Sequence, residues 1–113
     1  MKGKFVLKST GKEKFSFNLM AGNGRNILSS ESYTSRDSAL NGIESVRVNA
    51  RSGRNFERRT AKNGQPYFVL KADNLEVIGR SETYSSSNSM RKGIASVKAN
   101  ARSALLKDLT GKK

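Results

Sequence analysis

The residues of this sequence whose types and spacing could bind a ligand are lysines and arginines. Three of them stand at i, i+7 and i+11 in the second half of the chain, a spacing that places them on one face of a helix. Four more stand in the segment that joins the two halves and in the strand expected after it. Such groups hold phosphates through contacts that position a polymer backbone and read no base sequence. The candidate nucleic-acid-binding residues are Arg91, Lys98 and Arg102 of the helix, and Arg54, Arg58, Arg59 and Lys62 of the linker and strand.

The two predicted helices differ in how their basic residues are arranged. In the second helix, Ala95 leaves the positive face unbroken. The first helix carries Glu44 within helical reach of Arg47 and Arg51, and a carboxylate at that spacing partly neutralises the face. The sequence therefore favours the second helix as the binding surface.

The net charge of the chain favours an acidic partner. Lysine and arginine number 22 against 9 aspartates and glutamates, which gives +13. This excess attracts nucleic acid, an anionic membrane surface or an acidic protein. We predict nucleic acid or another polyanion as the partner. The alternative is a protein-interaction or stress-associated structural module in which the charge serves only solubility.

Tyr67, with Lys71 and Met20 nearby, is a weaker candidate for binding. An aromatic ring beside basic groups on an open sheet face can stack single-stranded bases. The chain has only 3 tyrosines and 5 phenylalanines, and most of them are needed for the core. Tyr33 and Tyr84, at matching strand-to-helix junctions, are predicted to anchor the helices with a buried ring and a hydrogen-bonded hydroxyl.

The sequence lacks most of the side chains and motifs that enzymes commonly use for catalysis. The chain has no cysteine and no histidine, which excludes disulfides, thiolate metal sites, a thiol nucleophile and an imidazole base. No serine stands in a Gly-x-Ser-x-Gly elbow, and Gly22-Asn23-Gly24 lacks the lysine of a phosphate loop. Glu31 and Glu82 are a formal carboxylate pair, but an internal duplication explains their equivalent positions. We predict a non-enzymatic protein without cofactor or bound metal.

The strands and helices that must position these residues come from a sequence that is duplicated within the chain. Sliding the chain against itself by 51 positions aligns Gly42–Arg51 with Gly93–Arg102 without a gap, and Ser30–Ser35 with Ser81–Ser86. One copy of about 50 residues would bury too little surface to be stable alone. The sequence therefore predicts a single domain over residues 1–113, made of two repeats of one supersecondary unit. The repeats span about residues 4–51 and 55–102, and a short C-terminal tail follows.

Each copy begins with patterns typical of three β-strands. Apolar and polar residues alternate with period two, as in half-buried strands. Asn23-Gly24 is expected to supply the two left-handed positions of a tight hairpin, whereas the matching turn Asp73-Asn74-Leu75 has lost the glycine. The residues predicted to face the core are Phe15, Phe17, Leu19 and Ala21 in the first copy and Phe68, Leu70 and Ala72 in the second, where Tyr67, Val69 and Lys71 face outward.

Each copy ends in a predicted amphipathic helix. Thr34 or Ser35, and Ser85 or Ser86, can accept the free N–H groups of a first turn, and Ser52-Gly53 is expected to end the first helix. The apolar stripes are Ala39, Ile43, Val46 and Ala50 in the first helix and Met90, Ile94, Val97 and Ala101 in the second. These patterns predict an α+β fold in which both helices pack on one face of a continuous antiparallel sheet. Residues 104–110 fit either an extension of the second helix or an edge strand, and the offset favours the strand.

The repeated motifs resemble those of the YegP-like family, a small bacterial domain of unknown function. The resemblance rests on Ser30-Glu31-Ser32-Tyr33 and Gly42-Ile43-Glu44-Ser45-Val46 with their echoes Ser81-Glu82-Thr83-Tyr84 and Gly93-Ile94-Ala95-Ser96-Val97. It covers nearly the whole chain and implies a strand-strand-strand-helix unit that is present twice and forms one shared sheet, hence a monomer. It implies no activity. The sequence departs from the family pattern at Leu75, where a turn glycine is common, and is more basic than such relatives usually are.

The N-terminal sequence predicts a cytoplasmic protein. No apolar stretch follows Met1-Lys2-Gly3-Lys4, as it would in a signal peptide. No run of residues approaches the roughly 18 apolar positions of a membrane-spanning helix. We therefore expect no membrane partner.

Overall fold

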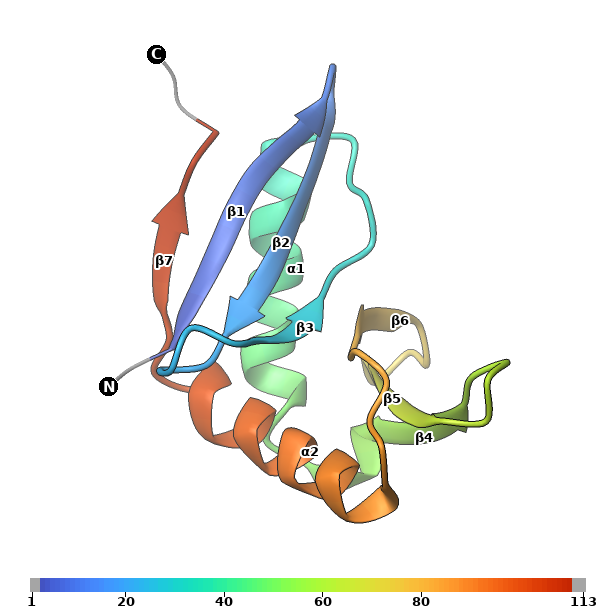
Figure 1. The fold of residues 1–113 in the computed structure, drawn as a ribbon. Helices are drawn as coiled ribbons and strands as arrows, with labels where there is room; N and C mark the ends of the chain where they lie inside the picture. Colours follow the sequence, from blue (N-terminus) through green and yellow to red (C-terminus); the bar gives the residue numbers. More distant parts are fainter. Residues whose placement is uncertain (1–2, 111–113) are drawn as a thin grey trace.

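The computed structural model describes residues 3–110 and contains two consecutive β-β-β-α units (Figure 1). A 3-10 turn, η1 (Gly53–Asn55), joins them, and a seventh strand follows the second unit. This order confirms the predicted repeat. The first unit consists of β1 (Lys4–Gly11), β2 (Lys14–Met20), β3 (Asn26–Ser29) and α1 (Arg36–Asn49), the second of β4 (Phe56–Thr60), β5 (Pro66–Lys71), β6 (Val77–Arg80) and α2 (Ser87–Ala101), and the last strand is β7 (Leu105–Asp108).

The strands form one sheet with the order β4-β5-β6-β3-β2-β1-β7. The two units meet through the antiparallel pair β3–β6, where Ser29 lies opposite Arg80. Exchanging the units leaves the order of the first six strands unchanged. The two repeats are therefore related by an approximate two-fold axis that passes between β3 and β6.

The tail forms an edge strand, and its direction corrects the predicted all-antiparallel sheet. β7 runs parallel to β1, with Lys4 opposite Leu105 and Leu7 opposite Asp108. The α2 helix ends beside the start of β1, so the chain enters the sheet there and continues in the direction of β1. The Leu105 N–H donates to the Gly3 carbonyl at 3.1 Å. The sheet is consequently mixed, with six antiparallel strands and one parallel edge.

The core lies between the sheet and both helices and is continuous across the two repeats. All eight residues of the predicted helix stripes are buried, as are Phe5, Leu7, Phe17 and Leu19 of the first unit. The α1 helix contacts β2 but also β5 and β6 of the other unit, and α2 contacts β5 but also β2 and β3. Each helix therefore completes its buried face only when both repeats are present.

Val69 faces outward as the sequence predicts, but its side chain is buried rather than exposed to solvent. Its side chain lies outside the core cluster, on the face away from the helices, yet none of its surface is exposed. Glu57 and Arg80 are its partners on the neighbouring strands. Long charged side chains cover apolar neighbours with their methylene groups, so Val69 is buried beneath polar residues.

Two tyrosines pack against the core beneath the helices as predicted, but both are partly buried rather than buried, and their hydroxyls differ from the prediction. The Tyr33 ring stacks on Phe17 with centroids 6.1 Å apart, and Tyr84 stacks on Phe68 at 6.2 Å. Each hydroxyl lies over a helical glycine, Gly42 or Gly93, where a Cβ atom would overlap it. Within the described part of the chain, neither hydroxyl makes a hydrogen bond.

Serine caps begin both helices. The hydroxyls of Ser35 and Ser86 accept hydrogen bonds from the backbone N–H groups of Ser38 and Ser89 at 3.0 Å. These contacts select the second residue of each predicted pair. The first helix ends slightly earlier than predicted, with its cap at Ala50.

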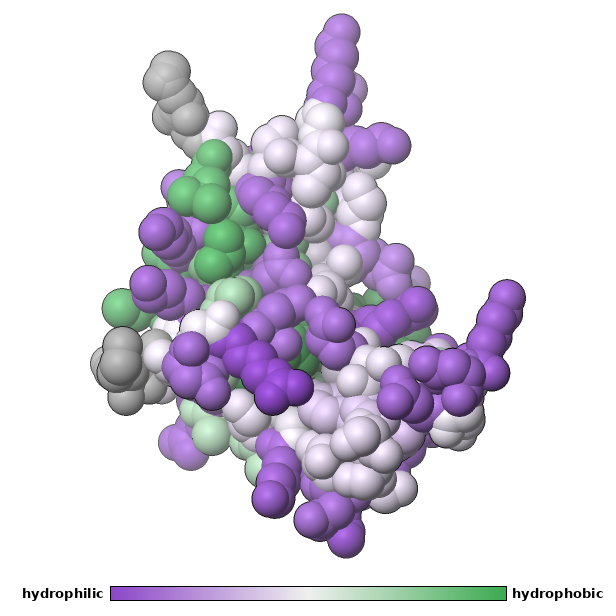
Figure 2. All heavy atoms as spheres, in the orientation of Figure 1, coloured by the Kyte–Doolittle hydropathy of each residue, from purple (hydrophilic) through white to green (hydrophobic). Residues whose placement is uncertain are grey.

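β7 leaves apolar side chains on the surface. Leu105, Leu106 and Leu109 are exposed, and Figure 2 shows hydrophobic residues gathered along this edge of the molecule. None of the described helices is long and apolar enough to cross a membrane.

The hairpin turns differ from the prediction at one position. In Asn23-Gly24 only Gly24 is left-handed, with φ +85°, because the turn is closed by two hydrogen bonds between Ala21 and residues 24 and 25 rather than by a two-residue loop. Leu75 occupies the equivalent position with φ +73°. A left-handed conformation costs an L-residue other than glycine roughly 1–2 kcal/mol. The β5–β6 turn is therefore strained at Leu75, whereas the β2–β3 turn is not strained at Gly24.

We expect Leu75→Gly to stabilise the protein by about 0.5–1 kcal/mol, because it removes this strain at a small cost in unfolded-state entropy. Leu75 is 72% exposed, so few contacts are lost. The reverse change, Gly24→Leu, is the matched control and should destabilise by about 1–2 kcal/mol, since a Cβ there meets nothing within 4 Å and only the backbone is strained. Urea unfolding followed by circular dichroism measures both. A loss of stability in Leu75→Gly would contradict the assignment of strain.

Candidate functional site

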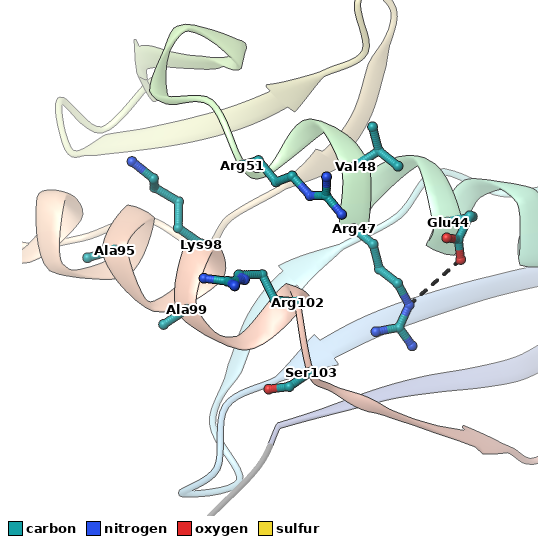
Figure 3. Close-up of a pocket in the computed structure, with 9 residues that line it drawn as sticks. All are labelled: Glu44, Arg47, Val48, Arg51, Ala95, Lys98, Ala99, Arg102 and Ser103. Atoms are coloured by element: carbon teal, nitrogen blue, oxygen red, sulfur yellow. Dashed lines mark ion pairs between the residues drawn. The ribbon is translucent and has the colours of Figure 1, made fainter.

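Four basic residues line a groove between the C-terminal halves of α1 and α2 (Figure 3). Arg47 comes from α1 and Lys98 from α2, whereas Arg51 follows the cap of α1 and Arg102 is the C-terminal cap of α2. The four side chains lie around the space between the C-terminal ends of the two helices. The groove has a volume of about 1320 Å³, and its remaining lining residues are Glu44, Val48, Ala95, Ala99 and Ser103.

The two-fold relation between the repeats builds this groove. Arg47 corresponds to Lys98 and Arg51 to Arg102, each pair 51 residues apart. A cation placed near the axis by one repeat is therefore matched by a cation from the other. Glu44 is the exception, because its counterpart is Ala95. Four positive charges and one negative charge leave the groove at +3.

Arg47 is engaged in the fold. Its guanidinium donates to the carbonyl of Ala101 at the end of α2, at 3.1 Å, and lies 4.8 Å from the centre of the Phe5 ring. It also approaches the Glu44 carboxylate at 3.8 Å. A cation suits a helix C-terminus, where unpaired carbonyls concentrate negative charge. Arg47 thus links α1 to α2 and β1, and these contacts leave its guanidinium less available to an external anion.

Arg51, Lys98 and Arg102 are the available cations of the groove. Among the described residues, no carboxylate forms an ion pair with any of the three. Lys98 is partly buried, and the other two residues are exposed. Like charges that line one groove repel one another, so a bound anion would relieve the repulsion.

The structure divides the predicted site residues into four groups, of which Arg59 alone is the last. Lys98 and Arg102 lie in the groove. Arg54 is exposed and follows Gly53, which lies next to the Lys98 ammonium. Arg91 is exposed on α2 but outside the groove lining, and Arg58 and Lys62 are exposed on β4 and in the turn after it.

Arg59 is already paired on the open face of the sheet. Its guanidinium lies 2.6 Å from the Glu57 carboxylate, which also accepts a hydrogen bond from Lys71 at 2.7 Å. The hydrogen bonds from Lys71 and then Arg59 lower the pKa of Glu57 to about 2. The single Glu57 carboxylate is shared by Arg59 and Lys71, so the charge of the predicted stacking platform around Tyr67 and Lys71 is partly compensated.

From the sequence, Glu44 is expected to neutralise part of the charge of both Arg47 and Arg51. The structure shows that Glu44 pairs with Arg47, whereas Arg51 forms no ion pair with any residue of the described range 3–110. The signal that could have identified Arg51 is the repeat itself, since Arg51 corresponds to the predicted Arg102. Recognising that signal requires knowing that the two helices converge at their C-terminal ends.

Glu31 and Glu82 meet at a small cavity of about 310 Å³ beside the β3–β6 junction, together with Arg80. Glu82 accepts a hydrogen bond from the Asn26 amide at 3.3 Å. The two-fold axis brings equivalent residues together here, as the duplication predicts. Over residues 3–110 no three carboxylates gather as they would around a metal ion.

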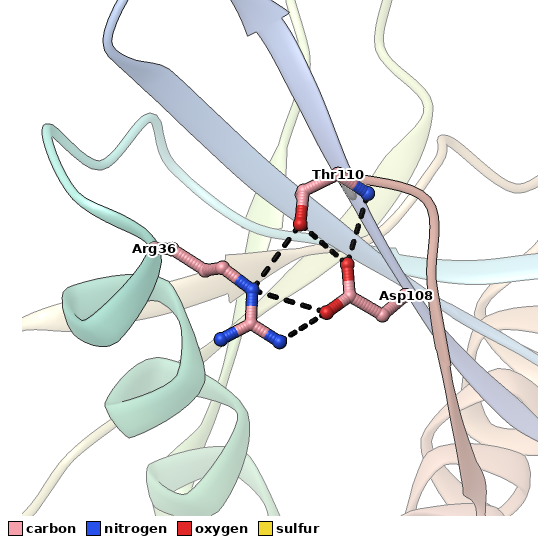
Figure 4. A network of polar contacts seen from close by, with 3 residues as sticks. All are labelled: Arg36, Asp108 and Thr110. Atoms are coloured by element: carbon pink, nitrogen blue, oxygen red, sulfur yellow. Dashed lines mark hydrogen bonds and ion pairs between the residues drawn. The ribbon is translucent and has the colours of Figure 1, made fainter. Parts of the chain in front are cut away.

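A further basic residue, Arg36, holds the tail (Figure 4). At the start of α1 its guanidinium pairs with the Asp108 carboxylate and lies 3.2 Å from the Thr110 hydroxyl. Hydrogen bonds from Thr110 and Arg36 lower the pKa of Asp108 to about 2. Arg36 therefore fastens β7 to α1 and is not free for an external anion.

The pKa of Asp108 provides a test of this clamp. In wild type, carboxyl carbon shifts in an NMR titration should give a midpoint of about 2 for Asp108. Arg36→Gln should raise the midpoint toward the ordinary 3.8 while Glu57 stays at about 2, because only Asp108 loses a partner. Both pKa values are lower than in the unfolded chain, so their stabilisation is present above about pH 4 and is lost as the pH falls toward 2. A wild-type Asp108 midpoint near 3.8 would show that the clamp does not form in solution.

Comparison with known proteins identifies relatives along the whole chain. The family described as "Domain of unknown function (DUF1508)" matches residues 12–57 and again residues 61–108, one match for each repeat. UPF0339 protein PM0519 of Pasteurella multocida is 55% identical over 108 residues, which cover 96% of this chain and 95% of the relative. UPF0339 protein YegP of Escherichia coli K12 is 49% identical over 110 residues, which cover 97% of this chain and 100% of the relative.

Two solved structures share the fold. The solution NMR structure of the E. coli protein of unknown function yegP superposes with a TM-score of 0.92 at 49% identity, covering 100% of this chain and 97% of that chain. The NMR structure of UPF0339 protein SO3888 from Shewanella oneidensis gives 0.90 at 44% identity, covering 97% and 93%. The duplicated α+β architecture is therefore shared with experimentally solved relatives.

Proposed function

Since the chain belongs to the DUF1508 family, whose function is unknown, we propose a function from its own surface: it is a non-enzymatic module that binds the phosphate backbone of nucleic acid in the groove between α1 and α2. The observation behind the proposal is the convergence of Arg51, Lys98 and Arg102, none of which has an ion-pair partner among residues 3–110. Phosphates are the partners that such a cluster of guanidinium and ammonium groups suits best.

The groove lining favours binding without base recognition. Val48, Ala95 and Ala99 lie between the basic residues, and none of them can donate a hydrogen bond to a base edge. The lining contains no asparagine, glutamine or aromatic residue, the types that read adenine or stack on bases. The proposed contacts are those of the cations with phosphates, and such contacts position a backbone without reading its sequence.

The setting of this proposal is a cytoplasmic monomer. One chain already supplies both halves of the sheet and both sides of the groove, so a second copy is not needed to complete the site. The alternative function, a protein-interaction or stress-associated structural module, uses the charge for solubility only and predicts little dependence of binding on salt.

We expect the variant Arg51→Gln, Lys98→Gln, Arg102→Gln to bind DNA and RNA at least about tenfold more weakly than wild type at low salt. Each phosphate contact contributes about 0.9 to the log–log salt slope on a duplex, so the slope should fall by about 2.7. Fluorescence anisotropy with labelled duplex and single-stranded oligonucleotides measures both quantities.

The matched control removes three charges from the β1–β2 hairpin, whose tip lies at the opposite end of the molecule from the groove (Figure 1). Lys8→Gln, Lys12→Gln, Lys14→Gln should change affinity by about threefold or less, because exposed charges far from the ligand are screened. Equal weakening in both triple variants would show that only the total charge matters. Salt-insensitive binding would favour the protein-interaction alternative, and no wild-type binding at low salt would overturn the proposal.

Single substitutions separate the remaining predicted residues. Arg54→Gln should weaken binding measurably, because Arg54 is exposed next to the groove. Arg59→Gln should leave binding unchanged, because its charge is paired with Glu57. Arg91, Arg58 and Lys62 should have smaller effects than Arg54, since they lie outside the groove lining. The same anisotropy titrations rank them, and a larger loss for Arg59 than for Arg54 would relocate the site to the sheet.

A further inference from the structure

A second cavity lies between the β2–β3 turn and the N-terminal half of α2, apart from the groove described above. Its volume is about 570 Å³, within the range of pockets that hold small molecules. Arg25 comes from the turn, and Tyr84, Ser89 and Lys92 come from the second repeat. None of the residues that line this cavity lines the interhelical groove.

Residues that carry hydrogen-bond donors predominate in the lining of this cavity. They include two cations, Arg25 and Lys92, and the hydroxyl-bearing residues Ser85 and Tyr84, among other polar residues. Neither cation forms an ion pair with a described carboxylate. The Tyr84 ring is fixed against Phe68, and its hydroxyl makes no hydrogen bond in the described part of the chain. Arg25 lies close enough to oppose the rise that burial causes in the pKa of Tyr84.

Glu82 is the acidic residue whose charge acts on Tyr84. It does not line the cavity, and its carboxylate accepts a hydrogen bond from Asn26. The donors inside the cavity are therefore not neutralised by an acidic residue in its lining.

The duplication supplies an internal control for the charge of this cavity. The position equivalent to Arg25 is Glu76, and the position equivalent to Lys92 is Asn41. These two lining positions thus bear +2 in one copy and −1 in the other. Folding does not require the positive charges, because the equivalent region folds without them.

We infer that this cavity binds a small phosphate monoester, with Arg25 and Lys92 holding the phosphate and the Tyr84 and serine hydroxyls donating to its remaining oxygens. A phosphate monoester carries about two negative charges near neutral pH and has three acceptor oxygens, which match two cations and several hydroxyls. A guanidinium pairs with phosphate through two parallel hydrogen bonds. Ala21 and Ile27 also line the cavity and offer an apolar surface to the organic group of the ester.

Phenyl phosphate is a suitable probe, with inorganic phosphate and diethyl phosphate for comparison. In ¹H–¹⁵N NMR titrations of the full chain, phenyl phosphate should shift the amides of Arg25, residues 84–89 and Lys92, and diethyl phosphate should bind at least about tenfold more weakly because it carries one charge. Shifts spread evenly over all basic surfaces, or equal affinity for the diester, would overturn the assignment.

Variants separate this site from the groove. Arg25→Gln with Lys92→Gln should weaken phenyl phosphate at least about tenfold and leave the salt-dependent binding of DNA and RNA within threefold. Arg51→Gln with Lys98→Gln is the charge-matched control and should show the reverse. The NMR spectra report whether each variant is folded. Equal effects of both double variants on phenyl phosphate would reduce the site to general attraction and refute it, whereas failure of oligonucleotide binding alone would refute only the groove.

Tyr84→Phe tests the hydroxyl without disturbing the ring that stacks on Phe68. We expect affinity for phenyl phosphate to fall several-fold, since one hydrogen bond to a charged group is lost. Tyr33→Phe is the matched control in the other repeat, where the same change should leave the affinity unaltered. A Tyr84→Phe protein that binds as well as wild type would remove the hydroxyl from the site.

Discussion

Each helix of this protein buries its apolar stripe against strands of both repeats, and the remaining structure depends on that shared burial. The α1 helix reaches β5 and β6, and α2 reaches β2 and β3, so the single core spans the β3–β6 junction. The pairing between β3 and β6 is short, with Ser29 opposite Arg80. The helices rather than this strand pair must therefore hold the repeats together, since burial of apolar surface is the main stabilising contribution.

An approximate two-fold axis follows from this arrangement and determines where charged residues of the two repeats come together. Residues near the axis meet their own counterparts, which is why two pairs of cations line one groove and why Glu31 and Glu82 share one small cavity. Gathering like charges costs free energy, and Arg47 lowers that cost by bonding to the end of α2 and to Glu44. The groove is stable without a ligand while three of its cations stay available.

The sequence predicts well whatever is decided locally and poorly whatever depends on neighbours brought by the fold. Helix stripes, serine caps and strand alternation are local, and the structure confirms them. The direction of β7 depends on where α2 ends, and the burial of Val69 depends on Glu57 and Arg80 of adjacent strands. Glu44, which precedes Arg51 in the chain, is visible in the sequence, whereas the α2 residues that line the groove with Arg51 are not. Arg59 is a different case, because its partner Glu57 lies two residues away on the same face of β4, and this pairing can be read from the sequence once β4 is assigned as a strand.

Distance from the axis determines how freely the two repeats can diverge. A substitution at the axis changes one half of a shared groove, as Ala95 does opposite Glu44, and the other half still contributes. A substitution far from the axis changes one of two separate copies, and the second copy keeps the original chemistry. The cavity with Arg25 and Lys92 lies in such a place, and its counterpart carries Glu76 and Asn41. The duplicated fold therefore permits one symmetric site for an extended anion and, away from the axis, an asymmetric site for a small one.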